Sequence, residues 1–115
     1  MNDKERNALK QILRYCRKTE DVRARFFPTR KQFDEEELYR DGCAFYIQQM
    51  GEFVNDLSDE FIEQHDNIAW HEIRGFRNII AHAYASVDTD ILWESITEDL
   101  PPLREFCERQ LENQK

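Results

Sequence analysis

Apolar residues recur every three or four positions along most of this chain, the pattern of helices that bury one face. The first such stretch covers residues 4–19, with an apolar stripe made of Ala8, Leu9, Ile12, Leu13, Tyr15 and Cys16. Thr19 stands before two acidic residues, a composition typical of a helix N-terminus, and predicts a short second helix, TEDVRARF. Pro28 ends that helix, and FPTRKQ is expected to form the connection.

The middle of the chain predicts one long helix followed by a short one. Asp34 and the three glutamates after it suit a helix N-terminus, and apolar residues continue at helical spacing to about residue 57. Ser58 and the acids that follow it predict a short helix, or a continuation of the long one past a bend.

The C-terminal half predicts two further helices. An Asp-Asn break at 66–67 precedes IAWHEIRGFRNIIAHAY, a strong helical pattern over roughly residues 68–83. Asp88 or Asp90 begins the last helix, and a proline pair at 101–102 interrupts it, so we expect a kink or a restart there. The whole pattern predicts an all-α antiparallel bundle of four to five helices, forming a single domain over residues 1–115.

Composition supports this fold class. The 115 residues include only three glycines and three prolines, which leaves few turn residues for an all-β fold. No apolar run is long enough for a membrane span, and MNDKERNALK lacks the apolar core of a signal peptide. We therefore expect a soluble cytoplasmic protein. Cys16, Cys43 and Cys107 are expected to be free, reduced thiols in or near the core.

The net charge of −8 hides a strong division along the chain. Residues 1–31 carry ten Lys or Arg against four Asp or Glu, whereas residues 32–115 carry six against twenty. An acidic protein repels polyanions, so contact with nucleic acid requires a local basic surface, and the first segment is its obvious source. A solvated helix face that balances the acidic remainder explains the same charges.

Two arginines, an asparagine, a histidine and a tyrosine lie close together in RGFRNIIAHAY. On an ideal helix Asn78 and His82 share the side opposite the apolar stripe, and Arg77 and Tyr84 flank that stripe. Arg77 and His82 are five residues apart, about 140° around the axis, so a straight helix does not present them on one face. Either the helix loosens near His82, or the site combines groups from two chains across a dimer axis.

These residue types suit cleavage of RNA phosphodiester bonds. A histidine titrates near neutral pH and can take the proton from a ribose 2′-hydroxyl, and arginine suits the phosphate and its transition-state charge. Asn78 could orient His82 or contact the phosphate. Arg74 could extend the phosphate site or pair with Glu72 or another acid. The segment has no carboxylate cluster, so we expect no metal and no cofactor.

Each candidate also has a structural explanation. A single helical histidine is more often a structural residue than a catalytic one. His65 and His71 are six residues apart, a spacing that does not converge on one helix face, which disfavours a metal site there. Trp70 and Trp93 fall at apolar helical positions, which favours packing anchors over platforms for stacked bases.

The run WHEIRGFRNIIAHAY, followed by VDTDILWESITEDLPPLREF, resembles the C-terminal half of HepT-like toxins of the HEPN superfamily. The family signature is Arg, four residues, His, one residue, Tyr, and it falls here on Arg77, His82 and Tyr84. Many relatives have glycine between the His and the Tyr, whereas this chain has Ala83, which favours a continuing helix. The match spans about half of the chain.

The resemblance implies an all-α homodimer that acts as a metal-independent ribonuclease toxin, with Arg77 and His82 of both subunits lining the cleft between them. It also implies a partner, a minimal nucleotidyltransferase antitoxin that transfers AMP to Tyr84. The homodimer and this partner could join in a larger toxin–antitoxin assembly. Two alternatives remain: a non-catalytic helical subunit that binds a nucleotidyltransferase partner or a nucleotide, and a helical dimer without phosphate chemistry. Tyr84 could equally be packed on the apolar stripe.

Overall fold

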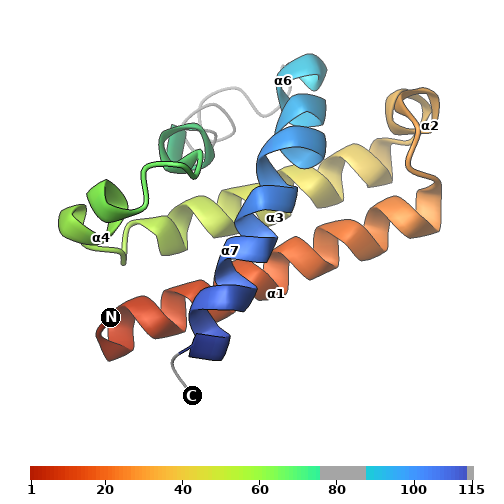
Figure 1. Cartoon of the computed structure of the whole chain (residues 1–115). Coiled ribbons are helices and arrows are strands. Elements are labelled where there is room, and N and C mark those ends of the chain that lie inside the picture. The colour runs from red at the N-terminus through yellow and green to blue at the C-terminus, as the bar shows by residue number, and fades with distance from the viewer. Residues whose placement is uncertain (76–87, 114–115) are drawn as a thin grey trace.

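The computed structural model describes residues 1–75 and 88–113, and within these ranges every regular element is helical (Figure 1). The elements are α1 (Asp3–Phe26), α2 (Arg30–Glu35), α3 (Glu37–Val54), α4 (Asp59–Gln64), α6 (Thr89–Glu94), the π-helix η2 (Ser95–Asp99) and α7 (Leu100–Asn113). Residues 70–75 are also helical. The predicted all-α fold is therefore confirmed.

The first helix is longer than the sequence pattern predicted. A capping box closes its N-terminus: the Asn2 side chain accepts from the backbone N–H of Glu5, and the Glu5 carboxylate accepts from that of Asn2. The prediction that Thr19 starts a separate helix is wrong, because Thr19 lies inside α1 and its hydroxyl donates to the carbonyl of Tyr15 at 2.9 Å. Nothing breaks the helix until Phe27, where φ reaches 78° directly before Pro28.

The start of the next long helix also differs from the prediction. Asp34 is not an N-cap, because it lies inside α2, where its carboxylate accepts from Arg30 at 2.8 Å. Thr29 caps α2 instead, accepting from the backbone of Gln32, so part of the expected connection is helical. α3 follows Glu36 and has no side-chain cap at its start.

The C-terminal half follows the prediction more closely. The side chains of Ser58 and Asp88 cap α4 and α6, as their positions indicated. The prolines interrupt the α-helical pattern but do not end the helix: helical backbone continues from Thr89 to Asn113, and the π-helical turn η2 directly precedes Pro101 and Pro102. A π-turn at this place fits the prolines, which lack the N–H that a regular helical hydrogen bond needs.

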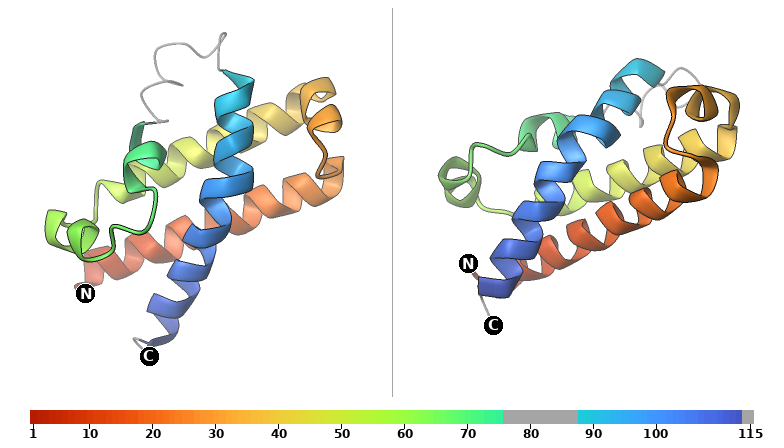
Figure 2. Two further views of the ribbon diagram at one scale, coloured as in Figure 1. Left: turned by 45° about the horizontal axis from the view of Figure 1, so that its top comes forward. Right: turned by 45° about the vertical axis from the view of Figure 1, so that its right-hand side comes forward.

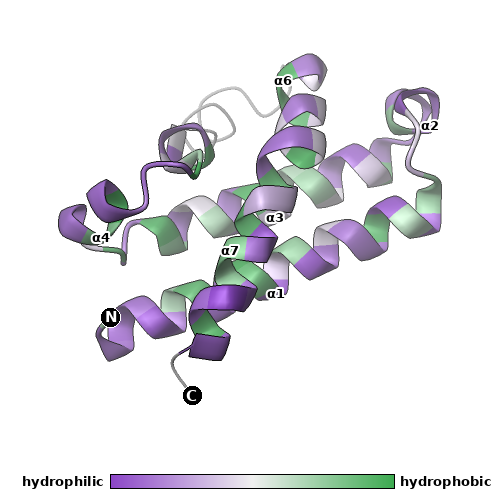
Figure 3. Cartoon of the chain, viewed as in Figure 1, coloured by the Kyte–Doolittle hydropathy of each residue, from purple (hydrophilic) through white to green (hydrophobic). Residues whose placement is uncertain are grey.

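The bundle is built on α1 and α3, which lie antiparallel and side by side, with α7 crossing them on one side (Figures 1 and 2). Each long helix has an apolar and a polar side (Figure 3). The core joins all the main helices through Leu9, Ile12, Phe33, Tyr39, Ile47, Met50, Leu92, Ile96 and Leu103. Among the described helices, none is long and apolar enough to cross a membrane.

Candidate active site

The helix at residues 70–75 leads into the predicted catalytic segment, and Trp70 holds its first turn in place. Trp70 is only 3% exposed, and its indole N–H donates to the carbonyl of His65 at 2.9 Å. Its ring meets Phe106 of α7 with centroids 5.5 Å apart, in an edge-to-face arrangement. These contacts confirm Trp70 as a packing anchor, and they tie this helix to α7.

Trp93 is also a packing residue. Its ring lies 5.1 Å from that of Phe33, centroid to centroid, and it packs against the core. The Arg23 guanidinium lies over the same ring at 5.5 Å. Neither tryptophan is therefore placed as an open platform for a base.

Arg74 is the one predicted site residue that falls within the described ranges. Its side chain is partly buried, and its Nε atom is buried without a hydrogen-bond partner in the described part of the chain. No ion pair joins it to Glu72 within residues 1–75 and 88–113, so one of its two predicted structural roles is not present there. Arg74 stands three residues before Arg77 in the sequence, so its guanidinium keeps its place as a candidate for an anionic group beside the predicted catalytic segment.

A hollow of about 430 Å³ opens between the helix at 70–75 and the α6–η2 segment. Its lining consists of Ala69, His71, Glu72, Gly75, Ile91, Glu94, Ser95 and Asp99. Gly75, which lines the hollow, stands two residues before Arg77, so the hollow borders the predicted catalytic segment in the sequence.

The hollow is acidic. Burial raises the pKa of Asp99 above its ordinary value, and repulsion from Glu72 and Glu94 raises this pKa further. A hydrogen bond with Ser95 opposes the shift but does not reverse it. Three carboxyl groups gathered in one place repel phosphate, so this hollow is not suited to an RNA backbone.

The central candidates of the predicted site are Arg77, Asn78, His82 and Tyr84. They lie outside the described residues, so their mutual geometry stays a prediction, as do the loosened helix and the site shared by two chains.

The other histidines have environments of their own. The ring of His65 packs between Phe61, at a centroid distance of 4.7 Å, and Phe106, at 4.9 Å, whereas His71 is exposed. Within the described ranges, no group of three or more His, Cys, Asp or Glu side chains is arranged to hold a metal ion.

The sequence analysis did not predict the acidic hollow, and the local sequence pattern carries no signal for it. Glu94 and Asp99 stand five residues apart in WESITED, a spacing that does not place them on one face of a regular α-helix. The π-helical turn η2 changes the positions of these two residues around the helix axis, so that both line the hollow. The helix at 70–75 adds Glu72 from another part of the chain. Neither effect is visible in the local pattern.

The helical bundle and the spacing of arginine, histidine and tyrosine together define a protein of the HEPN superfamily. Within it, the chain belongs to the HepT-like family: the family model described as "Ribonuclease HepT-like" matches residues 8–110.

Individual relatives agree with this assignment. A protein of Caldanaerobacter subterraneus named "Putative RNase" is 36% identical over 66 residues, which are 57% of this chain and 59% of the relative. One of Methanocaldococcus jannaschii, also named "Putative RNase", is 29% identical over 77 residues, 67% of this chain and 71% of the relative. A Thermococcus cleftensis protein named "Probable ribonuclease HepT" is 34% identical over 55 residues, 48% of this chain and 50% of the relative.

The aligned part spans about three fifths of the Caldanaerobacter protein and half of the Thermococcus protein. No solved structure gives a significant match to this chain.

Proposed function

We propose that this protein is the toxin of a toxin–antitoxin pair and acts as a metal-independent endoribonuclease. The observation that carries the proposal is the spacing of Arg77, His82 and Tyr84 in a chain that belongs to the HepT-like ribonuclease family. The names of the relatives support an activity on RNA.

The reaction requires two proton transfers at one phosphate. One imidazole takes the proton of the ribose 2′-hydroxyl as its oxygen attacks phosphorus, and a second gives a proton to the leaving 5′-oxygen. The phosphorus–oxygen bond to the 5′ side breaks, which leaves a 2′,3′-cyclic phosphate and a 5′-hydroxyl. The signature supplies a single histidine, His82, to each chain, so the site draws its second imidazole from another subunit of a homodimer.

Arginine provides the electrostatic part of this site. Arg77 of each subunit contacts the phosphate and stabilises the charge that develops in the transition state. Arg74 stands three residues earlier and extends the phosphate contacts, whereas the carboxyl groups of the acidic hollow disfavour a phosphate in that hollow. Asn78 orients the imidazole or binds the phosphate.

A minimal nucleotidyltransferase antitoxin controls the enzyme through Tyr84. The phenolic oxygen attacks the α-phosphorus of ATP, the bond between the α- and β-phosphates breaks, and pyrophosphate leaves while the phenolic proton passes to a base. The attached AMP places a negative charge near the arginines, where it competes with RNA.

The direct test is RNA cleavage by the purified chain and its variants in the presence of EDTA. His82→Ala is expected to lower the rate about 10²- to 10⁴-fold, the usual range for a general acid or base. Arg77→Ala is expected to lower it about 10²- to 10³-fold, as for other groups that stabilise transition-state charge. His71→Ala, an exposed histidine outside the signature, is the matched control and should retain full activity.

Full activity in His82→Ala or Arg77→Ala would refute the assignment, as would loss of wild-type activity in EDTA. A wild-type chain that leaves RNA intact but binds the nucleotidyltransferase would instead identify it as a non-catalytic subunit.

A further inference from the structure

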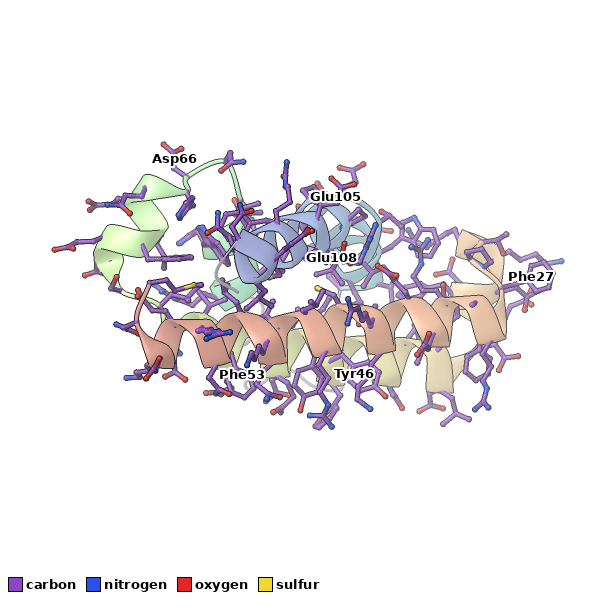
Figure 4. All side chains as sticks on the ribbon, turned by 60° about the horizontal axis from the view of Figure 1, so that its bottom comes forward. Phe27, Tyr46, Phe53, Asp66, Glu105 and Glu108 are labelled. Atoms are coloured by element: carbon purple, nitrogen blue, oxygen red, sulfur yellow. The ribbon has the colours of Figure 1, made fainter. Side chains whose placement is uncertain are left out.

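The side of the α1–α3 pair that faces away from α7 carries a group of aromatic rings. Figure 4 shows Tyr46 and Phe53 on this side, opposite Glu105 and Glu108 of α7. The rings of Tyr15 and Tyr46 lie 5.9 Å apart between centroids, and those of Tyr15 and Phe53 lie 6.4 Å apart and nearly parallel, at 27°. Phe45 extends the group and is 51% exposed. Tyr15, Tyr46 and Phe53 are half-buried and pack against the outside of the core, so part of each ring stays accessible.

Cations of α1 lie directly against these rings. The Arg14 guanidinium is 5.3 Å from the centroid of Tyr15, and the Lys18 ammonium is 5.9 Å from that of Tyr46. Arg25 and Lys18 line a shallow hollow of about 240 Å³ together with Asp21, Val22 and Tyr46. We call the residues Arg14, Tyr15, Lys18, Arg25 and Tyr46 the cation–aromatic surface.

These cations differ from those that face α7. Arg17 pairs with Glu108 at 3.7 Å, and Arg104 of α7 pairs with Glu20 at 2.7 Å. The ion pairs among the described residues leave Arg14, Lys18 and Arg25 without a carboxylate partner, although Asp21 lies in the same hollow. Their charge is therefore available for a ligand, in a chain whose residues 32–115 are strongly acidic.

Spacing along α1 suits an extended anion. Arg14 and Lys18 are four residues apart, and Lys18 and Arg25 seven, which corresponds to about 6 Å and about 10 Å along the helix axis. A single strand of nucleic acid offers regularly spaced phosphates and bases that stack on aromatic rings. A second protein chain fits less well, because burying three unpaired cations in a dry interface is costly.

We propose that the cation–aromatic surface binds single-stranded RNA outside the cleavage site, with phosphates on the α1 cations and bases against Tyr15 and Tyr46. This assignment rests on the proposed function for the identity of the ligand. It adds a substrate-holding surface on the N-terminal half of the chain, apart from the arginine–histidine signature. RNA bound there is retained by charge and stacking, so recognition tolerates different base sequences.

The test measures binding of a single-stranded oligoribonucleotide whose 2′-hydroxyls are methylated, so that cleavage cannot occur. The variant Arg14→Gln/Lys18→Gln/Arg25→Gln removes three positive charges from the surface. The control variant Lys10→Gln/Lys31→Gln/Arg109→Gln removes three exposed positive charges elsewhere, so both have the same net charge. Circular dichroism verifies that both variants fold.

The surface variant is expected to bind the probe about tenfold or more weakly than the control variant at moderate salt. The slope of log affinity against log salt should be smaller in magnitude by about 2 for the surface variant, since each of the three lost phosphate contacts on a single strand contributes about 0.7 to the slope. Tyr46→Ala should weaken binding about fivefold or more through lost stacking, whereas Tyr46→Phe keeps the ring and should bind within about twofold of wild type.

Equal affinities and equal salt slopes for the two triple variants would overturn the proposal. So would a change from dimer to monomer, by light scattering, that is confined to the surface variant, because a second copy would then occupy this face. The probe cannot be cleaved, so binding is measured separately from the reaction. A chain that binds the probe but does not cleave RNA would contradict the proposed function alone. A chain that cleaves RNA but does not bind the probe at this surface would contradict the binding proposal alone.

Discussion

The three histidines of this chain show how far the environment of a residue decides its role. His65 contributes its ring to an aromatic cluster, and His71 is exposed on the helix that begins at Trp70. Only His82 stands in the signature with Arg77 and Tyr84, and its role is proposed from that spacing. One side-chain type therefore has a packing role, a solvated position and a proposed chemical role within 18 residues of the sequence.

Tyr84 provides the sharpest prediction at the scale of a residue. Tyr84→Phe retains the ring but lacks the oxygen that would accept AMP, so the variant should fold, remain toxic and escape neutralisation by the nucleotidyltransferase. Intact mass spectrometry after incubation with the partner, ATP and magnesium should find added AMP on the wild-type chain alone. Tyr46→Phe is the control, since it removes a phenolic oxygen elsewhere and should be neutralised normally.

If the partner neutralises Tyr84→Phe as well as wild type, and no AMP is found on the wild-type chain, inhibition proceeds by binding alone. Tyr84 would then be a packing residue.

At the scale of elements, the sequence predicted which segments are helical better than it predicted where each helix begins and ends. Thr19 and Asp34 both looked like N-caps, yet Thr19 bonds within α1 and Asp34 pairs within α2. The same side chains serve caps and helix interiors, and the local pattern does not separate the two uses. Ser58 and Asp88 were identified correctly, and each has the extended backbone and the accepting side chain of an N-cap residue.

The start of α4 is linked to the start of α1 by one carboxylate. Glu5 accepts from the Ser58 hydroxyl at 2.7 Å and from its backbone N–H at 3.1 Å, besides capping α1. Hydrogen bonds from the Asn2 backbone and then from Ser58 lower the pKa of Glu5 below its ordinary value of 4.5. The link therefore stabilises the fold fully above pH 4.5 and weakens as the pH falls through the lowered pKa.

Glu5→Gln should lower the free energy of unfolding by about 1 kcal/mol at neutral pH, because a neutral amide oxygen accepts the hydrogen bonds of Asn2 and Ser58 more weakly than a carboxylate does. Below pH 4.5 the difference from wild type should shrink, because the wild-type carboxylate then takes up a proton. Urea unfolding at several pH values measures both effects, and Glu60→Gln, an exposed acid in α4, is the control. A difference that stays constant down to acid pH would contradict this role of the Glu5 charge.

At the scale of the whole molecule, the bundle separates charge as well as burying its core. Unpaired cations of α1 occupy one side of the α1–α3 pair, while Glu105 and Glu108 of α7 lie on the other (Figure 4). The excess of basic residues in the first segment is visible in the sequence, but their alignment with aromatic rings of α3 depends on packing between α1 and α3, as between Tyr15 and Tyr46. The acidic hollow likewise joins residues distant in the sequence.

A shared cleavage site predicts complementation between inactive chains. Arg77→Ala and His82→Ala are each expected to be inactive, but a mixed dimer retains an unaltered Arg77 on one chain and an unaltered His82 on the other. Co-expression with two different affinity tags allows the mixed dimer to be purified and its RNA cleavage measured. Activity above that of either variant alone is expected, but well below wild type, because the mixed dimer keeps one of the two imidazoles and one of the two Arg77 guanidiniums.

A mixed dimer as inactive as its parents would argue against a site in which groups of the two chains cooperate in this way. A monomer at micromolar concentration by light scattering, with activity retained by the wild-type chain, would exclude the shared site altogether.

The three cysteines are all buried, which has a practical consequence for labelling. Burial raises the pKa of Cys16 and of Cys43 to about 12, and it raises the pKa of Cys107 as well. Near neutral pH these thiols stay protonated and enclosed, so alkylating reagents attack them slowly. A cysteine introduced at the exposed position Glu105 would then take a fluorophore or a spin label selectively, and distances between the chains of the proposed dimer could be measured with every native cysteine left in place.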